Sequence, residues 1–144
     1  MKKIKLALVA MTLVMLWSCG KYEEGPAFSL RSKKSRIAGT WVYDKVLQDG
    51  VDVTAQSTSG NTYELTMEKD GTYKTVFSYT FLGQTISGED SGTWEFGDNE
   101  TIDVKSTTSN TTTTSTITRL TNSEYWTKST GSNGVVTEVH FKSK

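Results

Sequence analysis

The chain has 144 residues, of which 35% are hydrophobic and 22% charged, with 16 basic and 16 acidic side chains. This length suits one domain and is too short for two sizeable cores. The balanced charge argues against a nucleic-acid reader, which needs an excess of Lys and Arg. With one Cys and one His, the chain cannot form an internal disulfide or a zinc finger. We therefore expect no metal site and no cofactor.

Residues 1–18 have the pattern of a secretory signal peptide. Lys2, Lys3 and Lys5 precede an apolar run from Leu6 to Trp17 that only Thr12 interrupts. A charged start followed by a short apolar run is typical of export signals, and the run is too short to span a membrane comfortably. These residues are therefore excluded from the predicted fold.

The end of this run, Leu16-Trp17-Ser18-Cys19-Gly20, resembles the lipobox of bacterial lipoproteins. The resemblance implies that Cys19 becomes the first mature residue and carries acyl chains, which together anchor a protein stably to a membrane. It also implies an outer-membrane location, facing either the periplasm or the cell surface. The alternative is an ordinary signal peptide with an incidental cysteine.

Residues 19–36 are predicted to form a flexible tether. This segment contains the only proline of the chain and shows no sustained period of 2 or 3.6 residues. Fully extended, its residues could reach up to about 55 Å, enough to hold a domain clear of the lipid head groups. The domain itself is expected to occupy residues 37–144.

After Ile37 the sequence divides into short alternating segments separated by turn residues. Asp70-Gly71, between two alternating runs, is a strong hairpin signal. No segment is long enough for more than a short turn of helix. The pattern predicts eight antiparallel strands, around residues 41–47, 63–68, 73–81, 94–96, 102–104, 111–120, 125–129 and 135–142. Such an all-β, up-and-down meander is best closed as a barrel, because closure removes the unpaired edges.

Several motifs of the domain resemble those of lipocalins and related calycins. Gly39-Thr40-Trp41 opens the first strand, Ser91-Gly92-Thr93-Trp94 lies in the middle, and His140-Phe141-Lys142 lies near the end. Together with the lipobox, they resemble the small lipocalin-like lipoproteins common in Bacteroidetes. The resemblance covers the whole mature chain. It implies a lipocalin-like barrel in which Gly39 and Trp41 form a plug at one end.

The interior of an eight-stranded barrel can hold one small ligand or be filled by side chains. A small apolar molecule would be bound by aromatic residues predicted to face inward, which are Tyr63, Tyr73, Phe77, Tyr79, Phe81, Trp94 and Phe96. The first hypothesis is therefore a monomeric, lipid-anchored binding or carrier protein. The alternative is a structural or interaction lipoprotein whose barrel these same residues fill.

The sequence does not favour an enzyme. Nucleophilic catalysis usually needs a base beside the nucleophile, and the only imidazole, His140, is predicted on the outer face of the last strand. Glu89 and Asp90 are adjacent and would point to opposite faces of a strand, so we expect a solvated turn there and no carboxylate pair. Trp126 should face outward and be exposed, because its neighbour Tyr125 faces inward.

Overall fold

The computed structural model describes residues 30–144. The predicted signal peptide at residues 1–18, Cys19 and the first part of the predicted tether lie outside these residues. Within the described part of the chain, no helix combines the length and the apolar character needed to cross a membrane.

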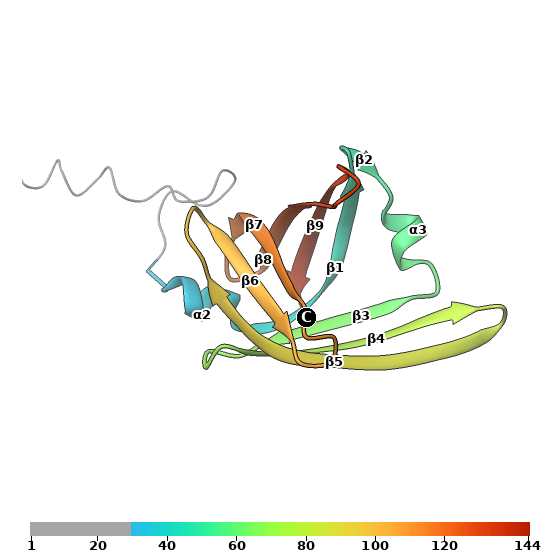
Figure 1. The fold of residues 1–144 in the computed structure, drawn as a ribbon, viewed down its shortest axis with the longest axis horizontal. Coiled ribbons are helices and arrows are strands. Elements are labelled where there is room, and N and C mark those ends of the chain that lie inside the picture. The colour runs from blue at the N-terminus through green and yellow to red at the C-terminus, as the bar shows by residue number, and fades with distance from the viewer. Residues whose placement is uncertain (1–29) are drawn as a thin grey trace, which may run out of the picture.

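Eight strands form a closed antiparallel barrel, as the sequence predicts (Figure 1). Each strand pairs with the next in the chain, and β1 also pairs with the last strand, which closes the ring. A two-residue strand, β2 (Val51–Asp52), adds only a short pairing to the end of β1. The barrel strands are β1 (Gly39–Gln48), β3 (Thr62–Met67), β4 (Thr72–Phe81), β5 (Gln84–Phe96), β6 (Thr101–Ser106), β7 (Thr112–Leu120), β8 (Glu124–Thr130) and β9 (Val136–Ser143).

Two tight turns set the register of the first hairpins. The predicted Asp70-Gly71 turn joins β3 to β4, with Gly71 at a φ of 93°. Leu82 and Gly83, at φ values of 49° and 78°, form the two-residue connection between β4 and β5. Positive φ at both central residues is the geometry whose twist matches that of a hairpin.

A short helix, α2 (Lys33–Ile37), lies at one end of the barrel, where the sequence pattern predicts flexible tether up to Arg36. The Ser32 hydroxyl accepts a hydrogen bond from the Ser35 amide, and Arg36 Nη1 donates to the Leu120 carbonyl over 2.8 Å. Ile37 is fully buried. The last residues of the predicted tether, 33–36, are therefore helical and held against the barrel by these contacts. A segment this short has no hydrophobic periodicity from which the helix could be predicted.

The main core lies toward the α2 end of the barrel. Trp41 is 1% exposed, and its indole Nε1 donates to the Ile37 carbonyl over 2.8 Å. Trp94, also buried, donates its Nε1 hydrogen to the Thr72 carbonyl over 3.0 Å. Both indoles thus bury their rings and satisfy their polar atoms, as buried Trp requires. Trp41 lies at the α2 end of the barrel, and its role as a plug stays a prediction.

The opposite end carries a second short helix, α3 (Thr54–Thr58), and the far part of the β4–β5 hairpin (Figure 1). Pairing between β3 and β4 ends at Ser78, and pairing between β5 and β6 begins only at Gly92. Residues 79–81 of β4 therefore extend beyond β3, and residues 84–90 of β5 precede the pairing with β6. This overhang gives the barrel one elongated lip.

Trp126 lies on the outer face of β8 but is only partly exposed, which corrects the expectation of an exposed indole. Its ring stacks on His140 at a centroid distance of 3.8 Å, and the Arg119 guanidinium lies 5.0 Å from its centroid. His140 Nε2 is 2.5 Å from a carboxylate oxygen of Glu138. The sequence predicts the outward direction of Trp126 and His140 correctly, but it does not show that neighbouring strands bring the two rings together.

Candidate functional site

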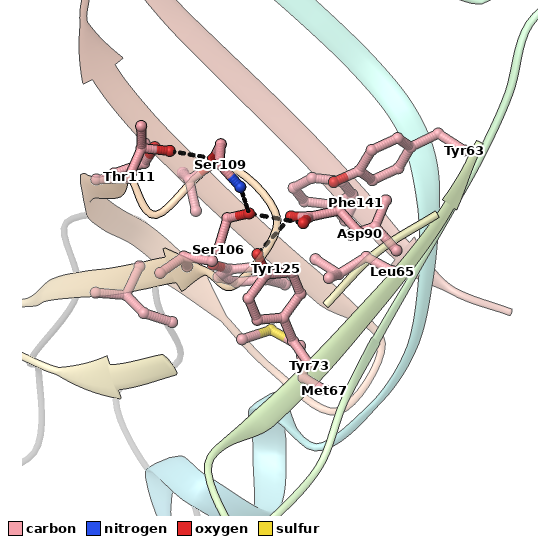
Figure 2. Close-up of a pocket in the computed structure, with 16 residues that line it drawn as sticks. Tyr63, Leu65, Met67, Tyr73, Asp90, Ser106, Ser109, Thr111, Tyr125 and Phe141 are labelled. Carbon is pink, nitrogen blue, oxygen red and sulfur yellow. Dashed lines mark hydrogen bonds between the residues drawn. The ribbon is translucent and has the colours of Figure 1, made fainter. Parts of the chain in front are cut away.

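A cavity of about 320 Å³ occupies the barrel interior (Figure 2). Sixteen residues line it, and they come from β3 to β9 and from the connection between β6 and β7. This volume lies at the lower end of the range typical of small-molecule sites, about 300 to 1,000 Å³. The barrel is therefore not completely filled by its side chains.

One part of the lining is apolar. Met67 and Ile102, each 1% exposed, and Leu65, 8% exposed, belong both to this lining and to the hydrophobic core. Val104 and Phe141 extend the same surface. A ligand that displaces water from these side chains would gain about 25 cal/mol for each Å² of apolar surface buried.

Hydroxyl groups form a second part of the lining. They come mainly from β6, β7 and the connection between these strands, and their positions alternate as expected for the inward face of a strand. These residues are Thr75, Ser106, Ser109, Thr111, Thr113, Ser115 and Thr127. The cavity thus offers hydrogen-bonding groups on one part of its wall and hydrocarbon on another.

Asp90 supplies the only charged side chain among the sixteen lining residues. The Tyr73 hydroxyl donates to Asp90 Oδ2 over 2.6 Å, and the Ser106 hydroxyl donates to Asp90 Oδ1 over 2.7 Å. Ser106 Oγ also accepts hydrogen bonds from the amides of Thr108 and Ser109, both over 3.1 Å. Those two amides occupy the acceptor positions of the Ser106 oxygen, so its own hydrogen is directed at Asp90.

Gly92 allows Tyr73 to reach this carboxylate. A Cβ atom on residue 92 would lie 2.9 Å from the Tyr73 ring and 1.9 Å from the Lys105 carbonyl oxygen, so any other residue would force the backbone or the ring to move. Gly92 is paired directly with Tyr73 across β4 and β5. The absence of a side chain therefore lets the ring lie against the strand, with its hydroxyl at Asp90.

The hydrogen bonds donated by Ser106 and Tyr73 lower the pKa of Asp90. Burial and the bond to Asp90 raise the pKa of Tyr73 to about 12. Because the folded pKa of Asp90 lies below its unfolded value of about 3.9, this network stabilises the fold above that value and loses its effect as the pH falls through the folded pKa. At neutral pH the cavity therefore holds a carboxylate anion beside neutral phenols.

Aromatic rings form a continuous stack along the side of the cavity that contains Phe141. Tyr43 and Tyr63 stack at a centroid distance of 4.4 Å, and Tyr43 lies 5.3 Å from Phe141. Phe141 in turn stacks on Tyr125 at 5.4 Å. Tyr63 and Phe141 line the same cavity as Asp90 (Figure 2). Burial, together with the nearby charge of Asp90, raises the pKa of Tyr63.

The structure brings together only part of the predicted aromatic lining. Tyr63 and Tyr73 line the cavity. Trp94 and Phe96 lie toward α2, where Lys34 and Lys33 approach their rings. Their side chains belong to the packing at the α2 end, outside the cavity lining.

The remaining predicted residues, Phe77, Tyr79 and Phe81, also lie outside this lining. Their strand parity is the inward one, but β4 continues past the end of β3, so Tyr79 is 41% and Phe81 63% exposed. Phe77 packs over Gly88, whose missing side chain leaves room for the ring. Alternation predicts which face these residues share, whereas the length of the neighbouring strands decides whether that face is enclosed.

The prediction of a solvated turn at Glu89 and Asp90 is wrong. Both residues lie within β5, where Glu89 points outward and pairs with Lys74 at 2.7 Å. Asp90 shares the inward face with Trp94, four residues later, and this spacing is the signal that could have located it. The inward hydroxyls at Thr111, Thr113 and Ser115 share the parity of buried Ile117 and could have been found in the same way.

No protein-family model and no curated protein matches the chain. Among solved structures, a redesigned β-barrel is similar at 17% identity over 81% of this chain and 99% of that chain, with a TM-score of 0.49. The odorant-binding protein from bovine nasal mucosa is similar at 12% identity over 81% of this chain and 77% of that chain, with a TM-score of 0.48. The same values apply to the complex of the bovine protein with undecanal. The undecanal in that complex is a ligand of the bovine protein.

Proposed function

We propose that this protein is a small-molecule-binding module and that its site is the barrel cavity. The observation that carries the proposal is the unfilled interior of about 320 Å³, which lies inside a closed ring of strands and is lined by both apolar and hydrogen-bonding groups. Pockets that combine an apolar wall with a few placed polar groups are typical of ligand sites. The alternative, a structural lipoprotein with a filled barrel, would leave this volume without a role.

The proposed setting is the bacterial envelope, with the domain anchored through acylated Cys19. The support is the lipobox-like sequence Leu16-Trp17-Ser18-Cys19 and the signal-like run before it. The described domain begins close behind the anchor in sequence, because α2 starts at Lys33. The protein would then bind or carry its ligand near the membrane as a monomer, in the manner expected of a lipocalin-like lipoprotein.

Native mass spectrometry of protein prepared without its acyl chains tests the binding proposal. The expected result is a species one ligand mass above the bare chain, either after purification or after addition of a panel of small amphiphiles. Removal of the extra mass by mild activation would identify it as non-covalent. A bare mass throughout, with no shift for any compound, would favour the structural alternative.

A further inference from the structure

We infer that the ligand is an organic ammonium compound, whose charged nitrogen binds Asp90 and whose apolar part occupies the Met67–Ile102 region of the cavity. This inference rests on the proposed binding function and specifies its ligand class. It draws on three features of the cavity: the electrostatic state of Asp90, the aromatic rings of the cavity wall, and the distribution of polar and apolar lining.

Asp90 carries a charge that the described residues do not neutralise. None of the ion pairs seen among residues 30–144 includes Asp90. The other titratable groups of the cavity lining are the phenols of Tyr63, Tyr73 and Tyr125, and the pKa values of Tyr63 and Tyr73 are raised above the ordinary value. The charged form of Asp90 is stabilised by hydrogen bonds from the side chains of Ser106, Tyr73 and Thr108 and from the backbone of Ser91. These donors are all neutral, so the negative charge of Asp90 has no opposite charge beside it among the described residues and suits a ligand with positive charge.

The aromatic rings of the cavity lining favour a cation over a neutral donor. Tyr63 and Phe141 both line the cavity, and their centroids lie 6.1 Å apart. Asp90 lies close enough to Tyr63 for its charge to raise the pKa of the phenol. Aromatic rings attract ammonium groups, so a cavity that holds both a carboxylate and aromatic rings is complementary to an alkylammonium group, whereas it repels a carboxylate ligand.

The lining also limits the rest of the ligand. The core residues Met67 and Ile102 are almost fully buried and offer no hydrogen-bonding side chain. A cavity of about 320 Å³ admits one small molecule. The fitting chemistry is therefore a short hydrocarbon or aryl body with one amine.

The test uses three probes with the same tail: octylammonium, 1-octanol and octanoate. Dissociation constants are measured by isothermal titration calorimetry for the mature wild-type protein prepared without its acyl chains, and for its variants Asp90→Asn and Glu89→Gln. Glu89→Gln is the matched control, because it removes one carboxylate from the adjacent residue on the outer face. Circular dichroism checks that each variant is folded.

We expect the wild-type protein to bind octylammonium at least about tenfold more tightly than 1-octanol, since hydrogen bonds to charged groups are worth that much. Asp90→Asn should reduce this preference to within about threefold, while Glu89→Gln should retain it. The preference should also disappear when the pH falls below the pKa of Asp90.

Two results would overturn the inference. Equal binding of octylammonium and 1-octanol by the wild-type protein would reject the ammonium class and leave the binding function in place. Retention of the full preference by folded Asp90→Asn would show that the charge of Asp90 does not select the ligand. Binding of none of the three probes, together with a bare native mass, would reject the proposed function as well.

Discussion

At the scale of single residues, the two tryptophans that differ most in environment are Trp41 and Trp126. Trp41 is 1% exposed, packs against Tyr125 at a centroid distance of 5.7 Å, and donates to the Ile37 carbonyl. Trp126 lies on the outside of the barrel between Arg119 and His140. The more deeply buried indole, that of Trp41, should therefore contribute more to the free energy of unfolding than that of Trp126.

Trp41→Ala should lower the free energy of unfolding by about 3 to 5 kcal/mol, the usual loss for truncating a buried Trp. Trp126→Ala should lower it by about 1 to 2 kcal/mol, because it removes one ring stack and one cation–π contact. Urea unfolding followed by circular dichroism measures both, since each substitution removes a fluorophore. Equal midpoints for the two variants, or a larger loss at Trp126, would mean that Trp41 is not the plug of the barrel.

At the scale of secondary structure, alternation predicts the strands because each has one inward and one outward face. Tyr63, Leu65 and Met67 alternate with polar residues, and this parity places all three toward the interior. Residues 111–120 are harder to assign, because Thr fills both faces over most of the segment. The pairing of β7 with β8 also shifts between Ile117 and Arg119, which places the consecutive residues Ile117 and Thr118 both in buried positions.

The features that alternation misses depend on contacts between distant segments. Helix α2 is only five residues long, and it is held by Arg36 on the Leu120 carbonyl and by Lys33 on Glu100 at 2.9 Å. The overhang of β4 and β5 depends on where the neighbouring strands β3 and β6 end. The sequences of β4 and β5 do not contain this information. Alternation also fails to identify Asp90 as the charged group of the cavity. Its position there depends on hydrogen bonds with Tyr73 and Ser106, which come from other strands.

At the scale of the whole molecule, the closed ring of strands separates an interior surface from an exterior one. The interior carries the apolar lining, the hydroxyls and Asp90, and the exterior carries pairs such as Lys74–Glu89 and Lys142–Asp44. A closed barrel can hold a ligand inside independently of the anchor proposed for the N-terminal segment. Binding and anchoring should therefore be separable by mutation.

Cys19→Ala tests the proposed anchor. The variant should leave the membrane fraction or keep an uncleaved signal, because it lacks the thiol that would carry the lipid. Fractionation and intact mass measurement of the wild type and the variant give the answer. Wild-type protein with no acyl mass, distributed like the variant, would contradict the anchor and leave the barrel site unaffected.

The central claim is that the interior of the barrel is the binding site, and adjacent residues of β7 provide a matched pair to test it. Ser115 lines the cavity, whereas Thr116 is exposed and does not line it. Ser115→Phe would add a ring to the unfilled volume, and Thr116→Phe would add the same ring outside.

The measurement is titration of each folded variant with N-phenyl-1-naphthylamine, whose fluorescence rises in an apolar site. We predict that Ser115→Phe weakens binding at least about tenfold, equivalent to about 1.4 kcal/mol, while Thr116→Phe binds like the wild type. Equal binding by all three proteins would show that the probe binds elsewhere and would contradict the claim.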